Sequence, residues 1–210
     1  GKNYTLNGKW HEKVFNNNNP IILELGCGRG EYTVELARNN PDNNYIGIDI
    51  KGARLWKGAK TINQESLRNV AFIRTRIEFI DSFFSENEVS EIWITFPDPQ
   101  LKQRRAKKRL TSAFFLNLYK KFLKENGIIH LKTDSNELFG FTLDLLRFNN
   151  NNILCFDNDI YSKKQIPDVL RIKTHYETKF LSDGKTIKYL SFLINKSTDY
   201  ANPPEIDDKS

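Results

Sequence analysis

Methionine is absent from the 210-residue chain, and cysteine and histidine are scarce, with two and three residues. Because there is no methionine, we expect that Gly1 is not the native start of the protein. Cys27 and Cys155 lie far apart without a C-x-x-C pair, which argues against a disulfide scaffold and against a zinc site. No apolar run approaches transmembrane length, and we expect no signal peptide. We therefore expect a cytoplasmic protein that is not bound to a membrane and holds no metal.

Acidic residues are missing from one stretch in particular. The net charge is +6, and residues 102–109 (KQRRAKKR) carry six cations and no acid, so the rest of the chain sums to zero. A basic patch confined to one stretch indicates a polyanionic partner. The plain alternative is a solvated basic helix face. The cations of this basic run are Lys102, Arg104, Arg105, Lys107, Lys108 and Arg109.

Short apolar runs alternate with amphipathic segments along most of the chain. This alternation predicts βαβ units and an α/β fold built on a mostly parallel sheet. The expected strands are 21–25, 44–50, 70–75, 91–95, 127–133, 153–159 and 186–195, and the expected helices are 31–40, 53–66, 111–126 and 136–148. Gly127 is expected to stop the third helix. We expect a polar N-terminal segment over 1–20, one domain over 21–196 and a flexible tail over 197–210.

A glycine-rich turn follows the first expected strand, in the stretch ELGCGRGE at 24–31. Gly26, Gly28 and Gly30 allow a tight turn and a close approach of the backbone to a ligand. Asp49 ends the second strand, where a carboxylate can accept hydrogen bonds from ribose hydroxyls. A purely structural βα turn is the alternative, but strand, turn, helix and acid occur in the order of a nucleotide site.

The flanking residues of this turn indicate which nucleotide it binds. The spacing is G-x-G-x-G, with Glu31 where a dinucleotide fingerprint has its third glycine, and Glu24 precedes the turn. Acids on both sides disfavour a pyrophosphate and suit a cationic ligand such as S-adenosylmethionine. E-x-G-x-G-x-G resembles the first motif of class I methyltransferases. A nucleotide-dependent oxidoreductase is one alternative interpretation, although its fingerprint would include the third glycine that is missing here.

The stretch TFPDP at 95–99 ends the fourth expected strand. Pro97 and Pro99 restrict the backbone around Asp98, so this carboxylate is placed to hold a nucleophile. The basic run that follows would contact a nucleic acid backbone through phosphates, which position the substrate without reading its sequence. A catalytically inactive RNA-binding module on the same fold is the second rival.

Several motifs in this order resemble the bacterial tRNA (guanine-N7-)-methyltransferase family. They are the glycine turn from Glu24, YIGID at 45–49, FPDPxxK at 96–102 with its basic tail, KTD at 132–134 and THYETKF at 174–180. The resemblance covers about residues 21–195. It implies a Rossmann-like class I methyltransferase fold with a seven-stranded sheet and helices on both faces. It also implies methyl transfer from S-adenosylmethionine to N7 of a guanine in the variable loop of tRNA.

Roles for individual residues follow from the resemblance, position by position. It implies cofactor contacts at Glu24 and Asp49, beside the loop glycines Gly26 and Gly28, and a catalytic role at the methyl donor for Asp98. It implies substrate contacts at Lys102, Asp134, Thr174, Tyr176 and Glu177. The resemblance also counts Asp98 and Arg76 among the cofactor-binding positions. The chain departs from the family pattern at three positions: Gln100 and Leu101 stand where many members have Trp-His, and Arg76 stands near where many members have an acid that helps to hold the adenine. Glu78 is a candidate substitute for that acid.

The expected chemistry needs no deprotonating base, because N7 of neutral guanine already carries a lone pair. Asp98 and Asp134 are the candidates to orient the base through its hydrogen-bond donors and to offset its developing positive charge. Asp134 has an alternative role, as part of a capping box with Glu137 at the next helix. His130 alternates within a strand and is expected to be a packed histidine. The sequence leaves monomer and homodimer open.

Overall fold

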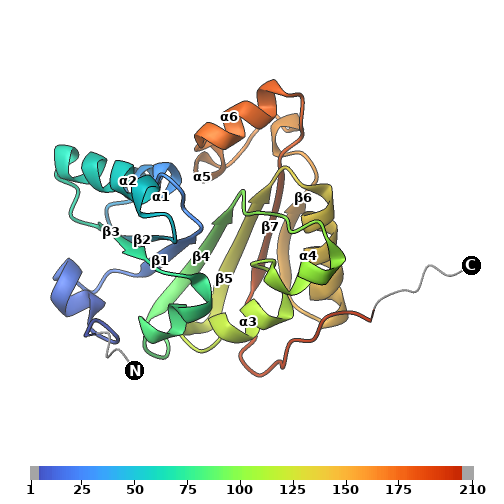
Figure 1. Ribbon diagram of the computed structural model, residues 1–210, viewed down its shortest axis with the longest axis horizontal. Helices are drawn as coiled ribbons and strands as arrows, with labels where there is room; N and C mark the ends of the chain where they lie inside the picture. Colours follow the sequence, from blue (N-terminus) through green and yellow to red (C-terminus); the bar gives the residue numbers. More distant parts are fainter. Residues whose placement is uncertain (1–4, 205–210) are drawn as a thin grey trace, which may run out of the picture.

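Seven strands form one sheet in the order β3-β2-β1-β4-β5-β7-β6 in the computed structural model, which describes residues 5–204 (Figure 1). The strands are β1 (Ile21–Leu25), β2 (Asn44–Asp49), β3 (Val70–Arg74), β4 (Val89–Thr95), β5 (Leu123–Thr133), β6 (Ile153–Asp157) and β7 (Lys188–Leu193). Strands β1 to β5 are parallel to one another, whereas β7 runs antiparallel to its neighbours β5 and β6. The predicted mostly parallel, seven-stranded sheet is confirmed.

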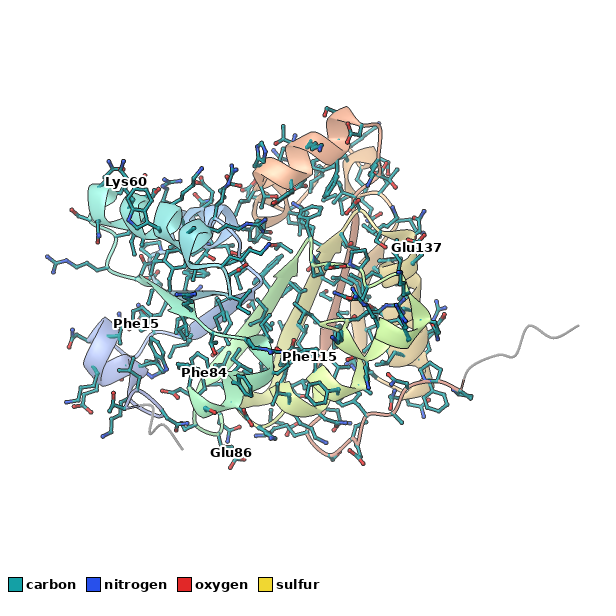
Figure 2. All side chains as sticks on the ribbon, viewed as in Figure 1. Phe15, Lys60, Phe84, Glu86, Phe115 and Glu137 are labelled. Atoms are coloured by element: carbon teal, nitrogen blue, oxygen red, sulfur yellow. The ribbon has the colours of Figure 1, made fainter. Side chains whose placement is uncertain are left out.

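Helices cover both faces of this sheet, as the sequence predicted. The α-helices are α1 (Glu31–Asn39), α2 (Gly52–Glu65), α3 (Ala113–Tyr119), α4 (Asn136–Phe148), α5 (Asp168–Arg171) and α6 (His175–Ser182). Short helical turns are η1 (His11–Phe15), η2 (Ile77–Ser82), η3 (Gln103–Lys108) and η4 (Ile160–Ser162). Two apolar clusters result, one with α3 and α4 and the other with α1, α2, α5 and α6. Phe84 and Phe115, labelled in Figure 2, belong to the first cluster.

Strand β1 shows why the central strands are mostly apolar. Its side chains alternate between the faces, so Ile21 and Leu23 join one cluster while Ile22 joins the other. Both faces are covered, and all five residues of β1 are buried. A strand buried on both sides is therefore apolar at nearly every position, with Glu24 as the exception in β1.

Helix α3 is shorter than the sequence predicts. Residues 111–126 were expected to be helical, but α3 ends at Tyr119 and β5 already begins at Leu123. The backbone amide of Val89 donates to the carbonyl of Phe122 at 3.1 Å, so pairing with β4 takes over this apolar segment. Gly127 lies inside β5 and does not stop the helix, because sheet pairing overrides the helical propensity of 120–126.

Residues near both ends of the described range pack more closely than the sequence suggested. Trp10 and Phe15 of the expected polar segment are buried in the first cluster, and η1 carries Phe15 there. In the expected flexible tail, Tyr200 is 4% exposed and its hydroxyl donates to Asn151 at 2.7 Å. An aromatic side chain and hydrogen bonds thus attach residues 200–202 of the expected tail to the domain. Residues 205–210 lie outside the described residues.

The strand order reverses between β1 and β4. The chain builds outward through β2 and β3 on one side of β1, and through β4 and β5 on the other. In open parallel sheets, the carboxyl ends of the strands on either side of such a point leave a crevice for ligands. The glycine turn, Asp49, Asp98 and Asp134 all follow or end these central strands.

Candidate active site

A cleft of about 730 Å³ lies at the carboxyl ends of β1, β2, β4 and β5 and is closed on one side by α6. It brings together most of the residues that the sequence singled out. These are Glu24, Gly26, Gly28, Asp49, Asp98, Lys108, Asp134, Thr174 and Tyr176. Four of them are carboxylates that come from the ends of four different strands, which makes the cleft suited to a ligand with positive charge.

The glycine turn and Asp49 form one hydrogen-bonded unit. One carboxylate oxygen of Asp49 accepts the backbone N–H of Gly28 at 2.9 Å, and the other accepts the N–H of Lys51 at 2.8 Å. Gly28 has a φ of 56°, and Gly30 has a φ of 72°. A side chain at Gly30 would also meet the Phe72 ring at 2.5 Å. Glycine is therefore required here both by backbone angle and by close packing.

Glu24 is 2% exposed at the end of β1 and is held by two threonines. Its carboxylate accepts hydrogen bonds from the backbone N–H of Thr33 at 2.8 Å, from the Thr33 hydroxyl, and from the Thr95 hydroxyl at 2.6 Å. Burial raises the pKa of Glu24 to about 7, although the hydrogen bonds from Thr33 and Thr95 act to lower it. The carboxylate thus bridges α1 and β4 beneath the cleft, and its charge depends on pH near neutrality.

Asp98 lies exposed in the loop after β4. Its Oδ1 accepts the backbone N–H of Gln100 at 2.9 Å. Two residues of the loop, Phe96 and Gln100, have φ values of 48° and 47°, a region that side chains other than glycine rarely adopt. The loop is therefore held in a strained conformation that keeps Asp98 at the cleft.

Arg109 holds this loop from below, so its predicted contact with an RNA backbone is wrong. It is 5% exposed, and its guanidinium donates to the carbonyl oxygens of Pro99 and Gln100 at 3.1 and 3.3 Å. The guanidinium carbon also lies 4.4 Å from the centre of the Phe141 ring. Burial lowers the pKa of Arg109. A guanidinium enclosed in this way cannot reach a phosphate.

The other cations of the basic run remain on the surface. Lys102 precedes η3, and Arg104, Arg105, Lys107 and Lys108 are exposed on or at the end of this turn. Lys108 lines the cleft. Arg76 lines a smaller adjoining cleft of about 290 Å³ together with Gly26 and Asp49, and its guanidinium pairs with Glu78 at 3.0 Å. Arg76 and Glu78 therefore stand together at this edge of the site.

Asp134 follows β5 and faces the cleft. The cap of α4 is Ser135, whose hydroxyl accepts the N–H of Leu138 at 3.1 Å. Asp134 is thus free of the capping role that the sequence left open. Its carboxylate instead accepts a hydrogen bond from Lys185 at 2.5 Å. A substrate that bonds to Asp134 would share it with this ammonium group.

The late motif forms α6, a helix that the sequence analysis did not predict. Thr174 caps it by accepting the N–H of Glu177 at 3.2 Å, the T-x-x-E pattern of a capping box. Tyr176 is 42% exposed and lines the cleft, as a residue that contacts substrate would. Arg54 lies 6.0 Å from its ring centre.

The predicted contact of Glu177 with substrate is wrong, because its side chain is fully buried. Its carboxylate pairs with Lys132 at 2.8 Å and accepts the Tyr161 hydroxyl at 2.7 Å. The Lys132 ammonium also donates to the carbonyls of Leu170 and Ile172. A carboxylate with these partners is not available to a substrate. Lys132 was missed, although a lysine in the apolar strand GIIHLKT is itself a signal of a buried partner.

His130 is a packed histidine, as predicted. Its ring stacks on Trp93 at 4.0 Å between centroids, and its Nδ1 lies 2.7 Å from the Tyr189 hydroxyl. Cys27 and Cys155 are both free thiols. Among residues 5–204, no cluster of three or more His, Cys, Asp or Glu could hold a metal ion. Within the same range, no helix has the length and apolar character needed to cross a bilayer.

Comparison with known proteins gives the family. A family model described as "Putative methyltransferase" matches residues 18–190. A tRNA (guanine-N(7)-)-methyltransferase of Christiangramia forsetii is 58% identical over 91% of this chain and 86% of the relative. The protein of the same name from Bacteroides fragilis is 52% identical over 95% of this chain and 79% of the relative.

Solved structures agree on the fold. The 16S rRNA methyltransferase KamB superposes with a TM-score of 0.66 at 15% identity, over 88% of this chain and 92% of KamB. An antibiotic-related methyltransferase superposes with a TM-score of 0.65 at 19% identity, over 87% and 92%. At this identity the likeness concerns the fold, which is that of the class I methyltransferases. By sequence, the chain belongs to the tRNA (guanine-N(7)-)-methyltransferase family.

Proposed function

We propose that this protein methylates N7 of a guanine in tRNA with S-adenosylmethionine as the methyl donor. One observation carries the proposal: Glu24, Asp49 and Asp98 converge on one cleft in a chain 58% identical to a relative named for this activity. The sequence resemblance further suggests the variable loop as the location of the guanine. The basic turn from Lys102 to Lys108 gives the mouth of the cleft the charge that tRNA requires.

The residues of the cleft fit S-adenosylmethionine. This cofactor carries an amine, a sulfonium and a ribose, and supplies an electrophilic methyl group. Asp49 presents a carboxylate at the end of β2, where it can accept hydrogen bonds from ribose hydroxyls. Glu24 would bring negative charge near the amine. Gly26 and Gly28, which have no side chains, would let the ligand approach the backbone of the turn. Arg76 and Glu78 would border the adenine from the adjoining cleft.

Positioning is the chief task of the protein in this reaction. Neutral guanine has a lone pair on N7, so no side chain has to remove a proton before attack. Asp98 and Asp134 would accept hydrogen bonds from the N1–H and amino group of the base and fix its orientation. Their negative charge would also stabilise the positive charge that develops on the ring as the methyl group arrives. Tyr176 would stack on an unpaired base at the mouth of the cleft.

Nucleoside analysis tests the proposal directly. The protein is incubated with methyl-labelled S-adenosylmethionine and unmodified tRNA, and the tRNA is then digested to nucleosides. We expect the label in 7-methylguanosine. Label in another nucleoside would contradict the target atom, and the absence of label in the presence of bound tRNA would favour an inactive RNA-binding module.

A further inference from the structure

A second cleft, similar in volume to the candidate active site, runs along α1 between α2 and the segment of α5 and α6. We call it the α1 groove; its volume is about 780 Å³. Figure 1 shows α1 and α2 facing α5 and α6 above the carboxyl end of the sheet. Arg29 and Glu31 line both the α1 groove and the active-site cleft. The two clefts therefore adjoin at the start of α1.

Cations without carboxylate partners line this groove. Arg29, Lys57 and Lys173 all face it, and none of them forms an ion pair within the described part of the chain. Lys57 and Lys173 are exposed, and Arg29 is partly buried. The Lys173 ammonium lies 4.9 Å from the centre of the Tyr161 ring.

The remaining charges of the groove offset these cations only in part. Arg38 pairs with Glu35, which lines the groove, and with Glu65 on α2. Arg171 lies 3.7 Å from Asp168, and the side chain of Asp168 is 96% exposed. Glu31 accepts the backbone N–H of His175 at 2.7 Å, so this acid is engaged in joining α1 to α6. Positive charge is therefore in excess along the groove.

We propose that the α1 groove binds phosphates of the tRNA backbone beyond the target nucleotide. The inference rests on the proposed function, because it takes its polyanion from the substrate of the adjacent cleft. Unpaired cations in a concave surface attract a phosphodiester chain. The groove and the basic turn η3 are built from different elements, yet both border the same cleft, through Arg29 and Lys108 respectively. A tRNA whose guanine enters the cleft would then be held on two sides.

The double variant Lys57→Gln/Lys173→Gln tests this groove without touching residues of the active-site cleft. Fluorescence anisotropy would give the Kd for tRNA over a series of salt concentrations. We expect Kd at low salt to rise about tenfold and the slope of log Kd against log salt to become shallower by up to about 2. The Kd for S-adenosylmethionine and the rate at saturating tRNA should stay unchanged.

Lys9→Gln/Lys124→Gln is the matched control. Both lysines are exposed, and neither forms an ion pair within residues 5–204. Lys124 lies near the start of β5, at the end of the strand opposite the cleft. Lys9 follows Gly8, whose backbone N–H donates to Glu88 just before β4. This control should leave Kd and the salt slope near the wild-type values. A groove variant that binds tRNA like wild type, or no worse than the control, would overturn the α1 groove as a tRNA site. Formation of 7-methylguanosine by the wild type is judged separately, so either proposal can fail alone.

Discussion

Arg109 donates a hydrogen bond from Nε to the backbone carbonyl oxygen of Pro99 at 3.1 Å, from a position inside the protein. Pro99 directly follows Asp98, and a second donor of the same guanidinium holds the carbonyl of Gln100. The loop that carries Asp98 contains two residues with positive φ, and such strain persists only when the surroundings impose it. Arg109 is therefore a positioning residue for the carboxylate of Asp98.

Replacement of Arg109 by lysine should reduce kcat rather than tRNA affinity. An ammonium cannot donate to both carbonyls in the fork geometry of a guanidinium, so the loop should relax and Asp98 should move. A shift of about 1 Å at a reacting group can lower the rate by about 100-fold. Steady-state kinetics should show a lower kcat with KM for tRNA little changed.

Arg104→Gln/Arg105→Gln provides the contrast, because both residues are exposed. This variant should weaken tRNA binding and flatten its salt dependence while leaving kcat at saturating tRNA near wild type. If Arg109→Lys behaved in the same way, Arg109 would contact RNA after all, and its assignment to the loop would be wrong.

The buried ion pair between Lys132 and Glu177 should be important for stability. Both side chains are fully buried, and removal of one partner of such a pair costs about 3–5 kcal/mol. We expect Lys132→Met to lower the free energy of unfolding in urea by about 3 kcal/mol. Because Glu177 lies in α6, hydrogen exchange should also increase in that helix.

The pair of Lys121 with Asp81 is the surface control, with the lysine side chain 60% exposed. Lys121→Met should lower the free energy of unfolding by less than about 1 kcal/mol. Equal effects of the two substitutions would show that Lys132 and Glu177 do not fix α6 to the sheet.

Glu24 should make both stability and cofactor binding depend on pH. Its pKa rises from 4.5 to about 7 on folding, so the folded state holds this proton more tightly than the unfolded state. Glu24 therefore contributes most to the free energy of unfolding below about pH 4.5, and this contribution declines by about 3 kcal/mol as pH rises to about 7. A cationic ligand favours the ionised carboxylate, so the affinity for S-adenosylmethionine should increase between about pH 6 and 8.

Calorimetric titration in buffers of different ionisation enthalpy would detect the proton released on binding. Glu24→Gln should abolish this release, whereas Glu31→Gln, at the exposed edge of the turn, should preserve it. An unchanged proton release in Glu24→Gln would mean that another group titrates with the ligand.

Patterns confined to one segment were predictable from the sequence. The bounds of β1 and α4 match the expectation because an apolar run between turns and a 3.6-residue apolar period are local signals. Asp49, Asp98 and Asp134 meet in the cleft because carboxyl ends of adjacent parallel strands share one edge of the sheet. Chain order and strand type were enough to infer that convergence.

The predictions that were wrong concern contacts between residues far apart in the sequence. The orientation of Arg109 depends on the position of Phe141, 32 residues away in sequence, and the burial of Glu177 depends on Lys132 across 45 residues. A charged side chain in a motif looks the same in the sequence whether it faces solvent or the interior. The early end of α3 likewise depends on the pairing of β5 with β4. Such contacts are decided by the assembled sheet.

Single-turnover kinetics of Asp98→Asn tests most directly whether the cleft is the catalytic centre. Asparagine preserves the size of the side chain but removes the charge that would stabilise the developing cation. We expect the rate of 7-methylguanosine formation to fall by about 100-fold or more, while the Kd values for tRNA and S-adenosylmethionine stay within about threefold of wild type. A wild-type rate in Asp98→Asn would contradict the assignment of Asp98 to catalysis and, with it, the account of this cleft.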